Sequence, residues 1–513
     1  MKRVVTEVTS VFWITLAITI AMSIWGSVAP GLFEEYSGVL MNFISVHFGW
    51  YYLLGVTFFV IFCIYLIFSR FGKIRLGKPN DRPEFSYASW FAMLFSAGMG
   101  IGLVFYGTAS PVSHYIKTPP TAEAGSVAAL EDALRITFFH YGIHAWAIYA
   151  IIGLILAYFT FRLGKPALVS STLEPLFGRS MKGGWGKAVD VIAVFATIIG
   201  VATTLGFGAT QINGGLTYLF GVDSDFWVQL VIIVIVTVLF MISTYSGLGK
   251  GIKYLSNANM GLAGLLFVGT LILGPTLYIL NSFTNTIGTY ILSLPVEALR
   301  IAPNSESERQ WIMDWTVFFW AWWIAWSPFV GIFIARISRG RTIREFLSGV
   351  LLVPTIVCFL WFATFGMSGI DIQNSGVDLA GLPDEQVLFG MFDHLPMGII
   401  LSILGILLIS TFFITSADSA TFVLGMQTTN GSLSPSNVVK FTWGIAQSLI
   451  AAVLLYTGGL QALQNVLISA AFPFSIIMLL MCISFYKALS KDKVGGIKAA
   501  NKGGNKGANK GGK

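Results

Sequence analysis

The chain has 513 residues, of which 55% are hydrophobic and only 11% charged, and its mean hydropathy is +0.76. Water-soluble domains carry about 25% charged residues, so this composition argues against a soluble enzyme. The net charge of +7 comes from basic residues spread along the chain, which argues against a nucleic-acid-binding surface. The 55 glycines and 14% aromatic residues are typical of a protein that crosses a membrane several times.

Membrane crossings can be predicted from stretches that contain no Asp, Glu, Lys or Arg. A spanning helix needs about 20 apolar residues. Each stretch accommodates one crossing except the last, which accommodates two with a turn at Thr457-Gly458-Gly459. We therefore expect twelve spans, from the stretches 8–33, 36–69, 85–116, 136–161, 191–222, 226–249, 254–296, 315–335, 346–370, 395–417 and 441–486.

The positions of the basic residues predict the orientation of these spans. With both termini in the cytoplasm, 27 of the 31 Lys and Arg residues fall in inside segments. Loops on the inside of a membrane are rich in Lys and Arg, so this count favours twelve spans with both ends inside. Four basic residues remain in outside loops: Lys117, Arg135, Arg300 and Arg309.

Two segments are expected to lie outside the membrane-spanning part. The segment 283–314 is polar enough to stay outside, and its stretch Ile287–Arg300 has apolar residues at near-helical spacing, as in a helix along the membrane surface. The tail 487–513 repeats Asn, Lys and Gly and carries eight lysines. It fits either a solvated disordered end or a segment that contacts anionic lipids.

Enzyme motifs are not present in the sequence. There is no His-Glu-x-x-His, no Walker loop and no Gly-x-Ser-x-Gly elbow, and the three cysteines have no zinc or disulfide spacing. His140 and His144 share a helical face but bring no nearby carboxylate. Helix packing explains this pair better than a metal site does.

The first informative motif is Ser96-Ala-Gly98-Met99-Gly100-Ile-Gly102, in the middle of the third predicted span. Residues two apart point away from each other on a helix, so these glycines cannot all serve one packing face. A helix that is broken where it lines a cavity would use them, because freed backbone groups can bind a substrate or a cation. The alternative is a glycine-rich packing helix.

The second motif is a cluster of five tryptophans within twelve residues, between Trp315 and Trp326. At about 100° per residue, one stripe contains Trp315, Phe319, Trp322 and Trp326. Interfacial tryptophans lie near span ends, yet this cluster reaches toward the middle of a span. Indole faces attract quaternary ammonium groups, so the stripe fits either an aromatic core or a cation-binding site.

A third motif, Phe412-Phe-Ile-Thr415-Ser416-Ala-Asp418-Ser, lies in the tenth span. Hydroxyl and carbonyl oxygens are hard ligands suited to Na⁺. Asp418 stands among apolar residues, where a carboxylate is functional by default. A structural role, in which Asp418 accepts hydrogen bonds near a helix break, is the interpretation we favour.

At these residues the sequence resembles the betaine/carnitine/choline transporter family of bacteria, over nearly the whole chain apart from the tail. The most specific match is Trp315–Arg341. The resemblance implies an all-α membrane protein with the leucine-transporter fold, a bacterial plasma-membrane location and a homotrimer. The implied parts are an N-terminal two-helix segment (1–84), a first five-helix repeat (85–282), the outside segment (283–314), a second, inverted five-helix repeat (315–486) and the tail (487–513).

The resemblance also implies a substrate site between the glycine-rich break and an aromatic box. Trp322, Trp323 and Trp326 would hold a trimethylammonium group, and Tyr149 would complete the box. Trp315 and Phe318 would line the route toward the cytoplasm. The remaining implied binding residues are Gly98, Met99, Gly100, Gly102, Trp146 and Tyr141, the last of which replaces a tryptophan of the glycine betaine carriers.

Two sodium sites are implied in the same way. The first maps onto Ser96 and Met99 and onto Phe412, Thr415 and Ser416. The second would use Thr197 and Phe329. There the other threonine of the family is replaced by Val201, which weakens this assignment.

The residue at position 102 bears on the substrate. Choline carriers of the family have Asp where this chain has Gly102, and carnitine exchangers replace sodium ligands that are intact here. The sequence therefore predicts sodium-driven glycine betaine uptake by alternating access, with no other cofactor and no enzymatic activity. A sodium-independent carnitine or betaine exchanger and a passive osmolyte channel or osmosensor are the alternatives, and proline betaine or a sulfonium analogue would present a similar cation.

Overall fold

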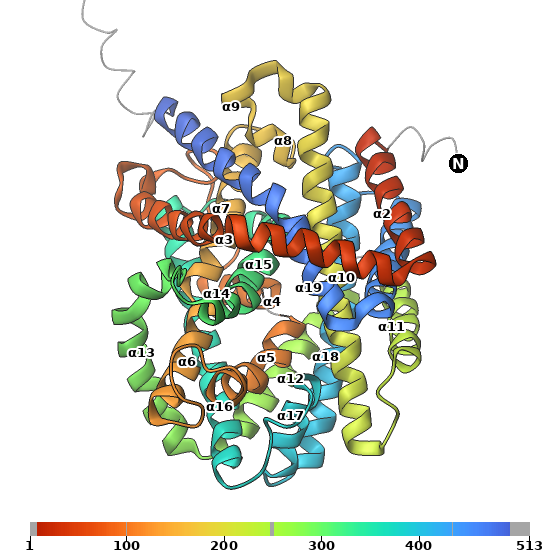
Figure 1. Cartoon of the computed structure of the whole chain (residues 1–513). Helices are drawn as coiled ribbons and strands as arrows, with labels where there is room; N and C mark the ends of the chain where they lie inside the picture. The colour runs from red at the N-terminus through yellow and green to blue at the C-terminus, as the bar shows by residue number, and fades with distance from the viewer. Residues whose placement is uncertain (1–7, 99, 247–250, 433, 493–513) are drawn as a thin grey trace, which may run out of the picture.

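The computed structural model describes residues 8–98, 100–246, 251–432 and 434–492, except for the side chains of 95–98, 246 and 251–254. The described chain is helical, and its one extended contact is an isolated bridge between Arg75 and Thr342. Figure 1 shows the arrangement of α2 (Ser10–Val28), α3 (Pro30–Phe68), α4 (Tyr87–Gly98), α5 (Ile101–Val112), α6 (Val127–Tyr141), α7 (Ile143–Ala157), α8 (Val169–Thr172), α9 (Glu174–Phe177), α10 (Gly184–Phe220), α11 (Phe226–Ser246), α12 (Gly251–Leu273), α13 (Thr276–Leu299), α14 (Glu306–Ile312), α15 (Phe318–Ile337), α16 (Ile343–Asn374), α17 (Asp384–Asp393), α18 (Gly398–Thr428) and α19 (Asn437–Lys491).

Ten helices in the described part of the chain are long and apolar enough to cross a membrane. They coincide with ten of the eleven charge-free stretches. The exception is 85–116, which forms the two 12-residue helices α4 and α5, each too short to span alone. The last helix, α19, contains non-helical backbone at Gly458 and Gly459, where the sequence predicts a turn between two spans.

The break predicted from the glycine-rich motif is present. Helix α4 ends at Gly98, Gly100 has an extended backbone (φ −152°, ψ −153°), and α5 begins at Ile101. A second interruption falls at Gly142, between α6 and α7. These two breaks leave backbone groups at mid-span available for contacts outside their own helices.

The helix expected over Ile287–Arg300 is longer than predicted. Helix α13 begins at Thr276, directly after Gly274 and Pro275 end α12. A proline lacks the N–H that would continue α12, so the chain starts a new helix there. The predicted boundary between 282 and 283 consequently falls inside α13.

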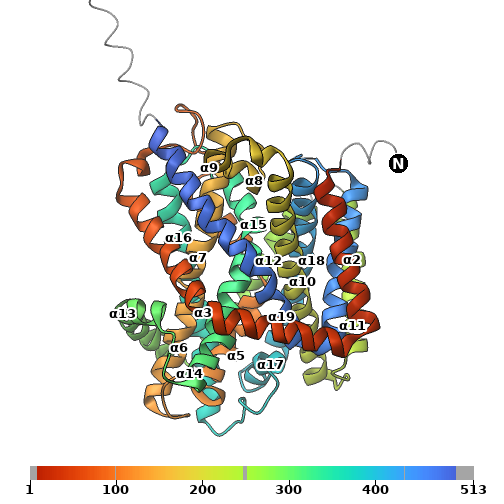
Figure 2. The same cartoon turned by 45° about the horizontal axis from the view of Figure 1, so that its top comes forward.

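Helices α7, α10, α15, α16 and α18 form the centre of the molecule, and α5 lies among them. Helix α3 lies across α7 and α19 on the outside of this bundle. In Figure 2, α8, α9 and the start of α2 lie at the same end of the molecule as the last turn of α19. The central helices position the aromatic residues described next.

Candidate functional site

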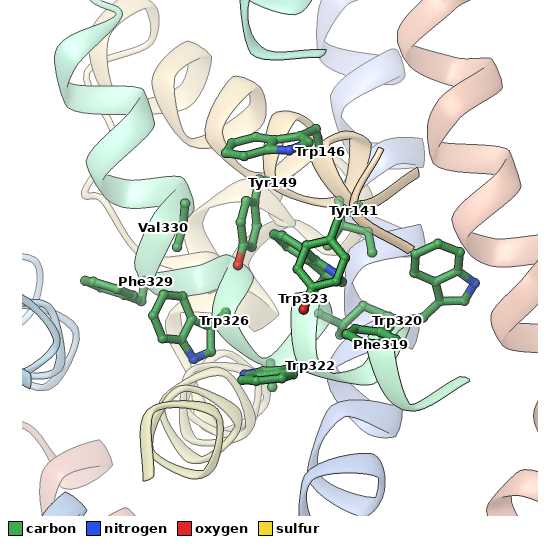
Figure 3. Packing of buried hydrophobic residues seen from close by; sticks show 14 of the residues in the cluster. Tyr141, Trp146, Tyr149, Phe319, Trp320, Trp322, Trp323, Trp326, Phe329 and Val330 are labelled. Atoms are coloured by element: carbon green, nitrogen blue, oxygen red, sulfur yellow. The ribbon is translucent and has the colours of Figure 1, made fainter. Parts of the chain in front are cut away.

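A small cavity lies where the α4–α5 break faces α15. Its wall consists of backbone from the break, two tyrosines, one threonine and four aromatic residues of α15 (Figure 3): Gly100, Ile101, Gly102, Leu103, Tyr141, Tyr149, Thr204, Phe319, Trp322, Trp323 and Trp326. The structure thus brings the glycine-rich and tryptophan-rich motifs together around one space. The cavity measures about 40 Å³, room for a few water molecules, so the rings lie close together in this conformation.

Helix α10 holds two of the three box tryptophans through their indole N–H groups. Trp322 donates to the Thr204 hydroxyl at 3.0 Å, and Trp326 donates to the Gly200 carbonyl at 2.9 Å. A side chain at position 200 would collide with α15, since a Cβ there would lie 3.0 Å from both Ala325 and Trp326. With each N–H bonded to α10, the donors of both indoles are occupied by α10, and the rings themselves line the cavity (Figure 3).

The tyrosines of α6 and α7 close the opposite side of the box. The Tyr149 ring lies 4.9 Å from the Trp323 ring at 63°, and the Tyr141 ring lies 5.7 Å from it at 83°. Tyr141 also donates to the Gly102 carbonyl at 3.2 Å, which ties this wall to the helix break. Trp146 does not line the cavity: it is fully buried behind the box, 6.1 Å from Trp323.

Trp315 and Phe318 line a separate cavity of about 220 Å³ with Tyr106, Asp314, Asp384, Gln461 and Gln464. The charge pattern assigns the loops that carry Asp314 and Asp384 to the outside of the membrane. In that topology Trp315 and Phe318 would lie on the outer route, whereas the family resemblance implies the cytoplasmic one. Both residues lie at the start of the continuous helix Glu306–Ile337, next to the segment that the charge pattern assigns to the outside.

The first predicted sodium site can be described only on its α18 side. Met99 and the side-chain surroundings of Ser96 and Gly98 lie outside the described residues. The Thr415 hydroxyl donates to the carbonyls of Thr411 and Phe412, at 3.0 and 3.2 Å. A Cβ at Gly100 would lie 3.8 Å from the Ser416 hydroxyl, so α18 approaches the helix break at this point.

Asn259 of α12 is a neighbour of this site that sequence analysis missed. Its amide nitrogen donates to the Thr415 hydroxyl at 2.9 Å. This amide occupies one of the two lone pairs of the Thr415 oxygen, so a cation bound to that oxygen would compete with it. The available signal was an uncharged amide inside the stretch 254–296, which a search for charged residues does not detect.

The second predicted sodium site combines Thr197 of α10 with Phe329 of α15, so it depends on how these two helices are aligned. These helices run antiparallel. Trp322 bonds to Thr204 and Trp326 bonds to Gly200, so a step of four residues forward along α15 corresponds to a step of four residues back along α10. The same register brings Phe329 toward Thr197 about one turn further on. Thr197 is fully buried and donates to the Ala193 carbonyl at 2.8 Å.

Three buried polar residues outside the box, Asp418, His140 and His144, contact neighbouring side chains. Asp418 accepts hydrogen bonds from Ser243 at 2.7 Å and from Thr244 at 2.6 Å, which confirms the structural role favoured from the sequence. His140 lies 3.0 Å from the Thr316 hydroxyl, and His144 stacks on Trp320. Among the residues that the structure describes, no three His, Cys, Asp or Glu side chains could share a metal ion.

Comparison with known proteins identifies the class to which these features belong. Residues 10–494 match the family described as BCCT, the betaine/carnitine/choline family transporters, and the chain belongs to this family. It is therefore a multi-pass membrane transporter and not an enzyme, as the sequence predicts.

Among the relatives, the glycine betaine transporter OpuD of Bacillus subtilis is 60% identical over 97% of both chains. The ectoine/hydroxyectoine transporter of Virgibacillus pantothenticus is 44% identical, with 94% of this chain and 96% of its own covered. The probable glycine betaine transporter of Desulfitobacterium hafniense is 43% identical, with 94% and 98% covered. The substrate named for most of these relatives is a methylated ammonium zwitterion.

Proposed function

We propose that this protein takes up glycine betaine by sodium-coupled alternating access. The observation that carries the proposal is the cavity between the helix break and the faces of Trp322, Trp323 and Trp326. A trimethylammonium group has no N–H to satisfy and is attracted by desolvated indole faces. The names of two relatives, which refer to glycine betaine, support the same substrate.

The carboxylate of the substrate would face the helix break. Gly100 and Gly102 expose backbone there, and freed N–H groups of a broken helix bind anionic groups. Among the residues that the structure describes, no acidic side chain lines the cavity, which suits a ligand that brings its own negative charge. Because the cavity is only about 40 Å³, the substrate would enter after the rings move apart and would be enclosed when they return.

Sodium coupling is proposed from the hydroxyls of Thr415 and Ser416 next to the break, with Thr197 and Phe329 as a second site. One Na⁺ supplies about 2.3 kcal/mol from a 100 mV potential, and a tenfold concentration gradient adds about 1.4 kcal/mol. This sustains about 500-fold accumulation of a neutral solute with one ion and about 10⁵-fold with two. High internal osmolyte levels favour two ions, whereas Val201 weakens the second site.

The membrane arrangement is proposed from the same features. Counting α4 and α5 together as one interrupted span, and α19 as two spans, brings the ten long helices to twelve crossings. The charge distribution then places both termini in the cytoplasm. Two inverted repeats (85–282 and 315–486), a homotrimer and contact between the lysine-rich tail and anionic lipids are carried over as proposals from the family resemblance and the tail composition.

The deciding experiment is flux of radiolabelled glycine betaine into proteoliposomes. Uptake against a substrate gradient that requires inward Na⁺ and stops with a sodium ionophore is expected. Uptake that continues without Na⁺ would contradict the coupling and favour an exchanger. Equilibration without accumulation would favour a passive channel, and competition by unlabelled ectoine, carnitine and proline betaine would rank the substrates.

A further inference from the structure

Among the described residues, three side chains with a hydroxyl group line the cavity of the aromatic box: Tyr141, Tyr149 and Thr204. They differ in their hydrogen bonds. Tyr141 donates to the Gly102 carbonyl at 3.2 Å. The Thr204 hydroxyl donates to the Gly200 carbonyl at 3.1 Å and accepts from an indole N–H of α15 at 3.0 Å. Two of these hydroxyls are therefore already bonded to the protein.

The hydroxyl of Tyr149 differs from the other two. Its oxygen has no hydrogen-bond partner in the described part of the chain, although the residue is only 2% exposed. Unlike Nδ1 of His144, which is both unpartnered and enclosed, this oxygen keeps accessible surface, and the space beside it is the cavity. In Figure 3 the ring projects from α7 with its oxygen directed toward Trp322 and Trp326. The Tyr149 oxygen therefore faces the space where a substrate nitrogen would lie.

Packing of the Tyr149 ring fixes the position of this oxygen. The ring lies 4.9 Å from the ring of Trp323 at 63° and 5.7 Å from the ring of Trp146 at 85°. Rotation of a phenol about its own axis leaves the oxygen in place, because the oxygen lies on that axis. Any other movement would displace one of the two indoles, which are buried in a close-packed interior. The oxygen is thus held in the wall of the box.

Backbone acceptors at the helix break are also occupied. The Gly100 carbonyl accepts from the N–H of Leu103 at 3.1 Å, and the Leu103 carbonyl accepts from the indole of Trp361 at 3.0 Å. In the described wall of the cavity, Tyr149 Oη is consequently the one side-chain oxygen with no hydrogen bond. Buried polar groups are normally satisfied by protein, water or a ligand, and a phenol oxygen can accept from an N–H.

We propose that the box also binds tertiary ammonium zwitterions, whose nitrogen carries two methyl groups and one N–H, with N,N-dimethylglycine as the simplest example. This substrate class rests on the proposed function, because it uses the same box. The methyl groups would contact the indole faces, and the N–H would donate to Tyr149 Oη. This charge-assisted hydrogen bond replaces one to water. Sarcosine and glycine, with two and three N–H groups, would find one free side-chain acceptor and leave the other groups unpaired.

Titration of the full chain in neutral detergent, followed by tryptophan fluorescence, measures binding apart from transport. The ligands are glycine betaine, N,N-dimethylglycine, sarcosine and glycine, at neutral pH with Na⁺ present. Dimethylglycine should bind within about tenfold of glycine betaine, and glycine at least about 100-fold more weakly, because two of its N–H groups stay unpaired. Binding of glycine betaine without binding of dimethylglycine would overturn this proposal and leave the proposed function standing. Absence of glycine betaine binding would overturn both.

Tyr149→Phe tests the oxygen itself, since it keeps the ring. The ratio of the Kd for dimethylglycine to the Kd for glycine betaine should rise about tenfold, as expected for the loss of a hydrogen bond to a charged group, and the ratio cancels any general change in packing. Tyr141→Phe is the matched control: its hydroxyl already donates to Gly102, so its removal should change both affinities by the same factor. Melting temperatures without ligand check that both variants fold. An unchanged ratio in Tyr149→Phe, or an equal rise in Tyr141→Phe, would overturn the proposal.

Discussion

The backbone of Gly102 lies directly against the ring of Trp322: a Cβ at position 102 would sit 3.0 Å from the Cη2 atom of the indole. Trp322 cannot retreat freely, because its N–H is bonded to Thr204 of α10. Any side chain at position 102 would therefore displace the ring by a few tenths of an ångström or break that hydrogen bond. The size of residue 102 and the shape of the aromatic box are set together.

This contact gives a prediction on substrate choice. Gly102→Asp would place a carboxylate beside the box, where it repels the carboxylate of glycine betaine and attracts a purely cationic ligand such as choline. We expect the half-saturation constant for glycine betaine to rise at least tenfold, about 1.4 kcal/mol, and choline uptake to become measurable. Gly102→Ala separates size from charge: it should weaken betaine uptake without admitting choline. Choline uptake by both variants, or by neither, would contradict this account.

Trp326 provides the test of the box itself. Replacing Trp326 by Leu removes a ring whose attraction for a desolvated cation is about 2 kcal/mol, so the half-saturation constant should rise about 30-fold. Trp326→Phe keeps a ring face but loses the N–H bond to Gly200, and an intermediate effect is expected. Trp227→Leu, at a site 67% exposed on α11, is the matched control. Initial uptake rates over a range of substrate concentrations would check the series, and an unaltered constant in Trp326→Leu would exclude the box.

The hydrogen bond from Asn259 to Thr415 predicts a competition with sodium. Thr415→Ala with Ser416→Ala should abolish sodium dependence, because both hydroxyl oxygens assigned to the first sodium site would be removed. Asn259→Ala removes the amide that occupies Thr415, so the sodium concentration for half-maximal uptake should fall about fivefold if one neutral hydrogen bond is released. Uptake rates against sodium concentration would show the change. A higher sodium requirement in Asn259→Ala would instead make Asn259 a ligand of the ion.

Thr197 tests the number of ions. If the α10–α15 register does form a second site, Thr197→Val should reduce the ratio of positive charges moved per substrate from two to one while leaving the box intact. The ratio can be measured as the reversal potential of uptake in proteoliposomes. Restoring the family threonine, Val201→Thr, should strengthen sodium binding. A ratio of one in the unchanged protein would assign all coupling to the Thr415 site.

Arg341 gives a prediction on stability. Its guanidinium is 4.0 Å from the Trp90 ring and 4.6 Å from the Tyr87 ring, and it donates to the Phe85 carbonyl at 2.8 Å. Because Arg341 is only 2% exposed, Arg341→Gln should lower the free energy of unfolding by about 2 kcal/mol. Thermal melting in detergent would measure the change. Arg309→Gln is the control. Arg309 pairs with Glu306 at the protein surface, so its replacement should change the free energy of unfolding little.

Much of the architecture could be predicted because it depends on local composition. Charge-free stretches locate the spans, and glycines two residues apart at Gly98–Gly102 predict the break that the backbone of Gly100 shows. The tryptophan stripe predicts a shared face, and Trp322 and Trp326 do line one cavity. Each of these inferences needs only the geometry of a single helix.

The remaining features depend on how separate helices align. Thr204 and Gly200 support the box through their hydrogen bonds to tryptophans of α15. Asn259 belongs near the predicted sodium site through its hydrogen bond to Thr415 of α18. None of these three roles could be predicted from the sequence. The cavity that Trp315 and Phe318 share with Asp384 and Gln464 depends likewise on how distant segments pack. No periodicity within one helix reports the register between two helices, so these relations required the structure.

The hydrogen bonds that join Trp322 and Trp326 to α10 have a consequence for selectivity. With their only donors committed and no acceptor of their own, these rings offer an incoming ammonium ion nothing but electron density. An unmethylated amine such as that of glycine would give up its bonds to water at the tryptophan faces without replacement, whereas a fully methylated nitrogen gives up none. Discrimination between an amino acid and its trimethylated form would then arise from the dehydration of the ligand rather than from its size.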